Sequence, residues 1–231
     1  MGNLRRASLD GATLRVNRAS RHLDEFEKMF REFRRSNKDK VIITQSSGVP
    51  PRVVVTIEDS LSVPLYLSLP VSDCIHNLRA ALDDLIHELA FLDRGAVMGG
   101  TQFPIEDSPS RFNSRKSTYL RGLSNDHIRA IESFQPYNGV DWTRTLRSIS
   151  NPDKHRHLIV LQPQRPPYLY THSSGELSET VLTMNGEETY LNKEDVLSIG
   201  FAGSTASVLE TLIELTVRVG ETVDRFKPDF G

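Results

Sequence analysis

The stretch VSDCIHNLRAALDDLIHELAFL, residues 71–92, predicts the central helix of the fold. Plotted at about 100° per residue, its apolar side chains fall on one arc, which is the pattern of a helix with one buried face. That arc consists of Val71, Cys74, Ile75, Leu78, Leu82, Leu85, Ile86, Leu89 and Leu92. We therefore expect an amphipathic helix over residues 71–92, with this arc in the core.

The same helix carries a polar stripe that includes His76, Arg79, Asp83 and His87. Arg79 and Asp83 lie one helical turn apart and are predicted to pair. Asp83 and His87 are also one turn apart, so they are able to share a proton or a metal ion. Asn77 lies on the flank of the stripe. The stripe is either the solvated face of the helix or one wall of a site.

Two long helices are predicted near the ends of the chain. The first, within residues 1–37, has an apolar seam spaced by three and four residues: Leu9, Ala12, Val16, Ala19, Leu23, Phe26, Phe30 and Phe33. The second, within residues 204–227, has a seam of Val208, Leu212, Leu215, Val219, Val223 and Phe226. Residues 1–40 are basic in sum and residues 173–231 are acidic. We therefore expect the two helices to pack together, within one chain or across a homo-oligomer.

Strands are predicted in two parts of the chain. Residues 37–51 have the composition of a loop, and residues 50–70 are predicted to form a β-hairpin that turns at Asp59-Ser60. Residues 151–202 are predicted to form a mostly antiparallel β-sheet, in which Asn185-Gly186 suits a type I′ hairpin turn.

The helical region is predicted to extend over residues 71–150. Within it, residues 93–122 are expected to form an irregular loop, whose length is unusual in a compact domain. Ser124 and Asp141 are predicted N-caps of two short helices that follow this loop, at 125–134 and 142–150. Helices, a mostly antiparallel sheet and a closing helix together predict a single α+β domain over residues 1–231.

The composition excludes several classes of protein. The chain of 231 residues has one cysteine, so an intramolecular disulfide or a thiolate metal cluster is not expected. The first residues lack the apolar core of a secretory signal, and no apolar run approaches the length of a membrane span. We expect a cytoplasmic protein that makes no membrane contact, and the sequence indicates no cofactor and no metal requirement.

A second polar cluster lies in SISNPDKHRHLIVLQP, residues 148–163. The residue before a proline is disfavoured in a helix, so Asn151-Pro152 is predicted to end the helix before it. Asp153 and Asn151 suit such a corner, because their side chains commonly bind nearby backbone amides. Lys154, His155 and Arg156 then precede an apolar strand, and three such side chains repel one another unless anions face them.

Four segments together resemble a family of bacterial and phage-associated proteins to which no activity is assigned. They are NLRAALDDLIHEL in the central helix, TQFPI, IESFQPY and LRSISNPDKHRHL. The resemblance covers about residues 70–160 and implies that Asn77, Arg79, Asp83, Asp153, Lys154, His155 and Arg156 belong to the family pattern. The chain departs from it at Asp84, where members often have histidine.

A weaker likeness is to helical HEPN-type RNases, which carry an arginine and a histidine on one helix with four to six residues between them. Asp84 occupies the place that the shorter spacing after Arg79 needs, and His87 lies one residue beyond the longer one. The likeness is an analogy at the level of the fold, which is a poor basis for function.

Two functional hypotheses follow from the two polar clusters. In the first, the protein binds a phosphate-bearing ligand, RNA or a nucleotide, through Arg79, Lys154 and Arg156. His155 then acts as an acid or base for phosphodiester cleavage, with Arg79 and Asp83 as further catalytic residues. Asn77, His87 and Asp153 complete the predicted ligand site. In the alternative, the protein is a non-catalytic interaction or structural protein, and the same residues form an ion-pair network that locks the fold.

Overall fold

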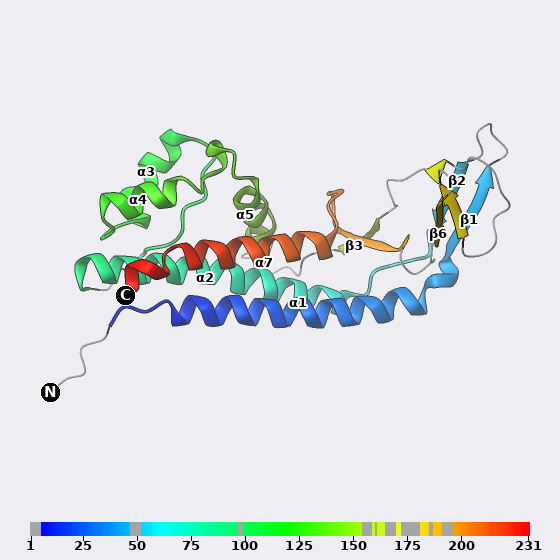
Figure 1. Ribbon diagram of the computed structural model, residues 1–231, viewed down its shortest axis with the longest axis horizontal. Coiled ribbons are helices and arrows are strands. Elements are labelled where there is room, and N and C mark those ends of the chain that lie inside the picture. Colours follow the sequence, from blue (N-terminus) through cyan, green and yellow to red (C-terminus); the bar gives the residue numbers. More distant parts are fainter. Residues whose placement is uncertain are drawn as a thin grey trace. The chain divides into compact units, whose positions relative to one another are not determined.

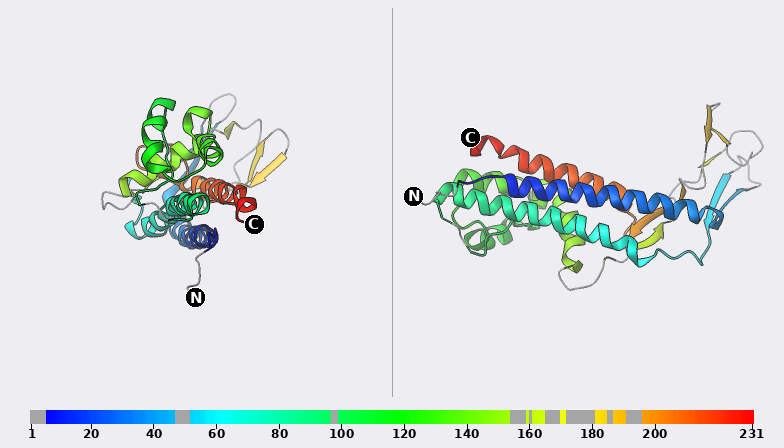
Figure 2. Two further views of the ribbon diagram at one scale, coloured as in Figure 1. Left: turned by 90° about the vertical axis from the view of Figure 1, so that its left-hand side faces the viewer. Right: turned by 90° about the horizontal axis from the view of Figure 1, so that it is seen from below.

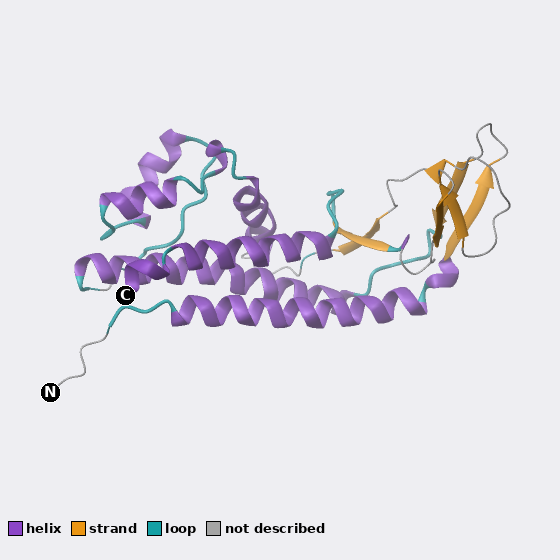
Figure 3. Ribbon diagram, in the orientation of Figure 1, coloured by secondary structure: helices purple, strands orange, loops and turns teal. Residues whose placement is uncertain are grey.

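The structure of the chain is a computed structural model (Figure 1). It describes residues 6–46, 52–96, 99–153, 159, 161–164, 170–171, 181–184, 187–190 and 196–231. The chain forms two compact units. The first contains Met1–Asp24, Leu69–Ile159 and Glu210–Gly231, and the second contains Glu25–Ser68 and Val160–Leu209. The described strands belong to the second unit, whereas the first is helical (Figure 3).

Three long helices lie side by side in the first unit: the start of α1 (Asp10–Ser36), α2 (Ser68–Arg94) and α7 (Val208–Arg225) (Figures 1 and 2). The arc predicted for the central helix is buried except at Leu92, and all six members of the C-terminal seam are buried. In the N-terminal seam, Val16 and Leu23 are only half-buried and the other six side chains are buried. The apolar periodicity therefore predicted these three helices and the faces that they bury.

The start of α1 contacts both of the other long helices. A Cβ at Gly220 of α7 would lie 3.6 Å from Val16 Cγ1, an ordinary van der Waals distance, so α7 packs against α1 at this point. Polar contacts also join α1 and the chain just before it to α2: Arg15 Nε lies 2.5 Å from Asp84 Oδ2, and the Ser8 amide donates to Glu88 Oε2 at 3.1 Å. Electrostatic pairing of the two terminal helices stays a prediction.

Three shorter helices lie on the opposite side of α2 and α7 from α1: α3 (Pro109–Tyr119), α4 (Asn125–Glu132) and α5 (Asp141–Asp153) (Figures 1 and 2). Ser124 caps α4 as predicted, since its side chain accepts the His127 amide at 3.2 Å. The prediction that 93–122 is an irregular loop was wrong, because α3 lies within it. Ser108 caps α3 and proline occupies the first turn, a combination that favours a helix start.

Two other predictions in this unit were wrong. The helix α5 continues through Pro152 to Asp153, because a proline in the last turn removes only one backbone hydrogen bond from a helix packed through Leu146 and Ser150. The sequence places His22 and His127 on predicted helices beside charged neighbours, which predicts that both lie at the surface. Instead, His22 is buried, and His127 is held between carboxylates: its Nδ1 lies 2.7 Å from Asp93 Oδ2.

All described strand pairings are antiparallel, which agrees with an α+β fold. A three-stranded sheet joins β1 (Val41–Ser46), β2 (Arg52–Ile57) and β4 (Tyr170–Thr171). The strand β3 (Leu161–Gln164) pairs with β7 (Ser198–Phe201). The pair β5 (Val181–Met184) and β6 (Glu187–Tyr190) has Met184 opposite Glu187. That register leaves two residues for the connection, as predicted, although Asn185 and Gly186 lie outside the described residues.

The predicted hairpin at 50–70 is not formed. The strand β2 pairs with β1, which lies in the segment expected to be a loop, with Val41 opposite Ile57. Pro64 lacks an amide hydrogen for a sheet, and the chain after it forms the 3₁₀ turn η2 (Leu65–Leu67) before α2. The residues Val41-Ile42-Ile43-Thr44 are all β-branched, and β-branched residues favour strands. This run could have predicted β1.

The single cysteine provides a test of the core of the first unit. Cys74 is fully buried in α2, and burial raises the pKa of its thiol to about 12, while a hydrogen bond with Thr216 of α7 opposes the rise. Because the thiolate is the reactive form, the native protein should react with iodoacetamide at pH 8 at least about a hundredfold more slowly than the protein in denaturant. Mass spectrometry of quenched samples measures both rates. Fast labelling of the native protein would contradict the packing of α2 against α7.

Candidate functional site

The predicted Arg79–Asp83 pair forms on α2, and both side chains bind the backbone of Phe103. Arg79 Nη2 lies 3.0 Å from Asp83 Oδ1 and donates to the Phe103 carbonyl oxygen at 2.5 Å. Asp83 Oδ1 accepts the Phe103 amide hydrogen, with 2.8 Å between nitrogen and oxygen. One ion pair thus satisfies both backbone polar groups of a residue that is fully buried.

Gln135 holds the next residues of the same segment. It is fully buried at the corner between α4 and the 3₁₀ turn η3 (Pro136–Asn138). Its Nε2 donates to the Pro104 carbonyl at 2.9 Å, and its Oε1 accepts the Glu106 amide hydrogen at 2.9 Å. Gln135 therefore binds the backbone on both sides of Ile105.

Arg147 of α5 completes the set of contacts. Its Nη1 donates to the Ile105 carbonyl at 3.0 Å, and its Nη2 lies 2.7 and 2.6 Å from the two carboxylate oxygens of Asp107. Hydrogen bonding to Arg147 lowers the pKa of Asp107 below its ordinary value of 3.8, and the positive charges of Arg147, Arg144 and Arg111 act in the same direction.

Residues 103–107, the clamped segment, are therefore held by side chains and not by a helix or a sheet ladder. Buried backbone groups need hydrogen-bond partners, and a segment without regular structure must find them elsewhere. Arg79 and Asp83 come from α2, Gln135 from the corner after α4, and Arg147 from α5. Four parts of the quoted sequence pattern thus meet at one place: the central helix, the FPI segment, the QPY corner and LRSIS.

A small cavity of about 150 Å³ lies beside the clamped segment. Arg79, Arg147, Tyr119, Gln102 and Ser150 line it, together with residues 103–106. The Arg79 side chain is 12% exposed, and its buried Nε has no hydrogen-bond partner among the described residues. Two arginines against one glutamate make the lining of the cavity basic, and Arg79 has a buried donor that the described contacts leave unused.

The structure describes only part of the predicted site. Asn77 is half-buried and donates to the Asp73 carbonyl one turn earlier at 2.8 Å, a contact within its own helix. His87 is half-buried, one turn beyond Asp83. The backbone of Asp153 ends α5. Lys154, His155 and Arg156 lie outside the described residues, so the predicted approach of His155 to Arg79 and Asp83 stays a prediction.

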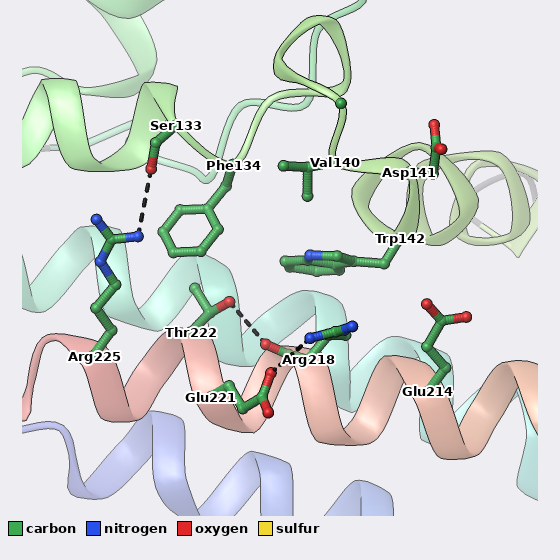
Figure 4. Close-up of a pocket in the computed structure, with 11 residues that line it drawn as sticks. Ser133, Phe134, Val140, Asp141, Trp142, Glu214, Arg218, Glu221, Thr222 and Arg225 are labelled. Atoms are coloured by element: carbon green, nitrogen blue, oxygen red, sulfur yellow. Dashed lines mark hydrogen bonds and ion pairs between the residues drawn. The ribbon is translucent and has the colours of Figure 1, made fainter.

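A larger pocket, of about 690 Å³, lies between α7 and the chain from Ser133 to Trp142 (Figure 4). Phe134, Val140 and Trp142 form one wall of this Trp142 pocket. The other wall is a face of α7 made by Glu214, Arg218, Glu221, Thr222 and Arg225. Sequence reasoning missed this pocket, although Glu214, Arg218, Glu221 and Arg225 follow the spacing of one helix face, because the spacing does not say what the face meets.

Comparisons of the chain with protein-family models, with curated proteins and with solved structures gave no match. Of the helices that the structure describes, none is both long enough and apolar enough to cross a membrane. Among the described residues, no group of three His, Cys, Asp or Glu side chains is placed to hold a metal ion.

The Asp107–Arg147 contact predicts how stability changes in acid. A carboxyl group whose pKa is lowered by folding contributes stability above its unfolded pKa, and that contribution is lost as the pH falls through the lowered value. The contribution of Asp107 should therefore be complete near neutral pH and decline below about pH 4. Urea unfolding of the wild type and of Asp107→Asn should differ at pH 7, and the difference should shrink as the pH is lowered below the ordinary pKa of 3.8. A difference that does not change with pH would contradict the ionic contact.

Proposed function

We propose that the protein is a non-catalytic binding protein in which Arg79 and Asp83 lock the fold. One observation carries this proposal: both side chains bind the backbone of the same residue. The Phe103 amide donates a hydrogen bond to Asp83, and the Phe103 carbonyl accepts one from Arg79. Groups occupied in this way are poorly placed to bind and release a substrate. The same geometry therefore favours a structural role for two of the three residues predicted to be catalytic.

The loss of stability expected when one partner of this ion pair is removed supports the structural role. Replacing both partners of a buried ion pair is often tolerated, but removing one leaves the other without its partner and is strongly destabilising. At Arg79 the loss is larger than the pair alone, because the Phe103 carbonyl would also lose its donor. A network of this kind fixes where the clamped segment lies, and so where the FPI segment, the QPY corner and α5 meet.

The lock is tested by Arg79→Ala. This change should reduce the free energy of unfolding by about 2–3 kcal/mol, because it leaves a buried carbonyl and the Asp83 carboxylate without Arg79. Urea denaturation followed by circular dichroism measures the difference.

The matched control is Arg31→Ala on α1, which breaks an ion pair of the same i, i+4 spacing whose side chains are 58% and 49% exposed. Its effect should stay within about 0.5 kcal/mol. Equal effects of the two substitutions, or an Arg79→Ala protein of wild-type stability, would refute the lock.

A second candidate function is the binding of a phosphate-bearing ligand, RNA or a nucleotide. It is favoured by the basic cavity, whose lining includes Arg79 and Arg147. The sequence continues from α5 directly to Lys154, His155 and Arg156. In this candidate function, Lys154 and Arg156 hold the phosphate together with Arg79. His155 transfers the proton in phosphodiester cleavage.

Fluorescence anisotropy with a labelled single-stranded RNA tests this candidate at several salt concentrations. Lys154→Ala and Arg156→Ala should each weaken binding and reduce the slope of log affinity against log salt by about one. His155→Ala should abolish cleavage while RNA still binds. Arg121→Ala, a change of the same charge at an exposed position outside the cavity, is the control. If Arg121→Ala weakens binding as much as Arg156→Ala, the binding is not specific to the cluster and the candidate fails.

A further inference from the structure

The Trp142 pocket contains an aromatic wall that already binds a cation of the chain itself. The rings of Phe134 and Trp142 meet edge to face, with centroids 6.4 Å apart and planes at 70°. The Arg225 guanidinium lies over the Phe134 ring, 5.0 Å from its centroid. A cation over an aromatic face is attracted by the negative face of the ring, and tryptophan gives the strongest such attraction.

The charges on the other wall are mostly paired. Arg218 Nη1 lies 3.2 Å from Glu221 Oε2 on the same helix. The Asp141 carboxylate points away from α7 in Figure 4 and is bound by Arg144 at 2.7 Å. No described hydrogen bond or ion pair involves Glu214, whose carboxylate reaches from α7 to the side of the pocket where Trp142 lies (Figure 4). Within the described structure, Glu214 is therefore the lining carboxylate that has no counter-ion.

We propose that the Trp142 pocket binds an organic cation, an alkylammonium or guanidinium group with an apolar body, between the Trp142 ring and the Glu214 carboxylate. The ring attracts the positive charge and packs against the apolar body, while the carboxylate supplies the counter-charge. The source is either a free polyamine or a lysine or arginine side chain in a basic segment of a partner protein.

The way the charges are paired in the pocket opposes an anionic ligand. Asp141 is neutralised by Arg144, so the remaining lining charges are the carboxylates of Glu214 and Glu221 and the guanidinium groups of Arg218 and Arg225. Both guanidinium groups already have partners, in Glu221 and in the Phe134 ring. A phosphate would meet an unpaired carboxylate of its own sign, whereas a cation meets that carboxylate and the negative face of an aromatic ring.

Trp142 is the only tryptophan in the chain, so its fluorescence reports directly on this pocket. The probes are spermidine and an acetylated Gly-Lys-Gly-Lys-Gly-Lys amide, which carry the same positive charge. We expect at least one of them to change the emission of Trp142 in a saturable way at concentrations up to about 10 mM. A response to spermidine alone indicates a free polyamine, and tighter binding of the peptide indicates a partner's side chain.

The variants test whether Glu214 supplies the counter-charge. Glu214→Gln, at an exposed position, should weaken binding by roughly tenfold without lowering the melting temperature. Asp224→Asn removes the same charge from the same helix outside the pocket, and should change the affinity by less than about twofold. Three results would overturn the proposal: no saturable change with either probe, equal weakening by the two variants, or a stronger response of Trp142 to inorganic tripolyphosphate.

This inference rests on the proposed binding function, yet the two fail in different experiments. The lock is measured as a loss of stability in Arg79→Ala, and Arg79 does not line the Trp142 pocket. The pocket is measured as a loss of affinity in Glu214→Gln at unchanged stability. A protein with the lock but without cation binding would therefore leave the first proposal intact and refute only the second.

Discussion

The hydrogen bonds from Arg79 and Asp83 to the backbone of Phe103 are the contact on which the rest of the first unit depends. They hold an extended segment with no strand partner against α2, in a place where water does not satisfy its backbone. A buried amide or carbonyl without a partner costs more free energy than an average hydrogen bond contributes. The clamped segment is therefore able to exist only because charged side chains project toward it from α2.

The same constraint explains why the other polar residues of this region are where they are. Gln135 and Arg147 take the Pro104, Ile105 and Glu106 groups that the Arg79–Asp83 pair does not reach. Gln135 comes from the corner after α4 and Arg147 from α5. The clamped segment therefore links three parts of the unit: α2, this corner, and α5. The Arg79–Asp83 pair, which suggested part of an active site, thus also has a sufficient structural explanation.

Apolar periodicity predicted more of this protein than its polar motifs did. The arc of α2 and the seam of α7 are buried as expected, because a 3.6-residue period places the same residues on one face in any tertiary context. The pairing of Arg79 with Asp83 is equally local, since residues four apart are neighbours on a helix. Strand pairing was harder. The sequence offers β2 a candidate partner on each side along the chain, and the pattern within β2 does not say which of them pairs with it. The segment after β2 contains Pro64, which lacks the amide hydrogen that a strand needs, and β2 pairs with β1 instead.

The sequence by itself determined the long helices, the faces that they bury and the ion pair within α2, because each depends on residues one to four positions apart. Only the tertiary structure decided what that ion pair binds, since Phe103 is 20 residues from Asp83 along the chain. It also decided that the charged face of α7 lies opposite Trp142. Contacts of this kind depend on how elements pack together, and the spacing of residues within one element contains no information about the surface that it will meet.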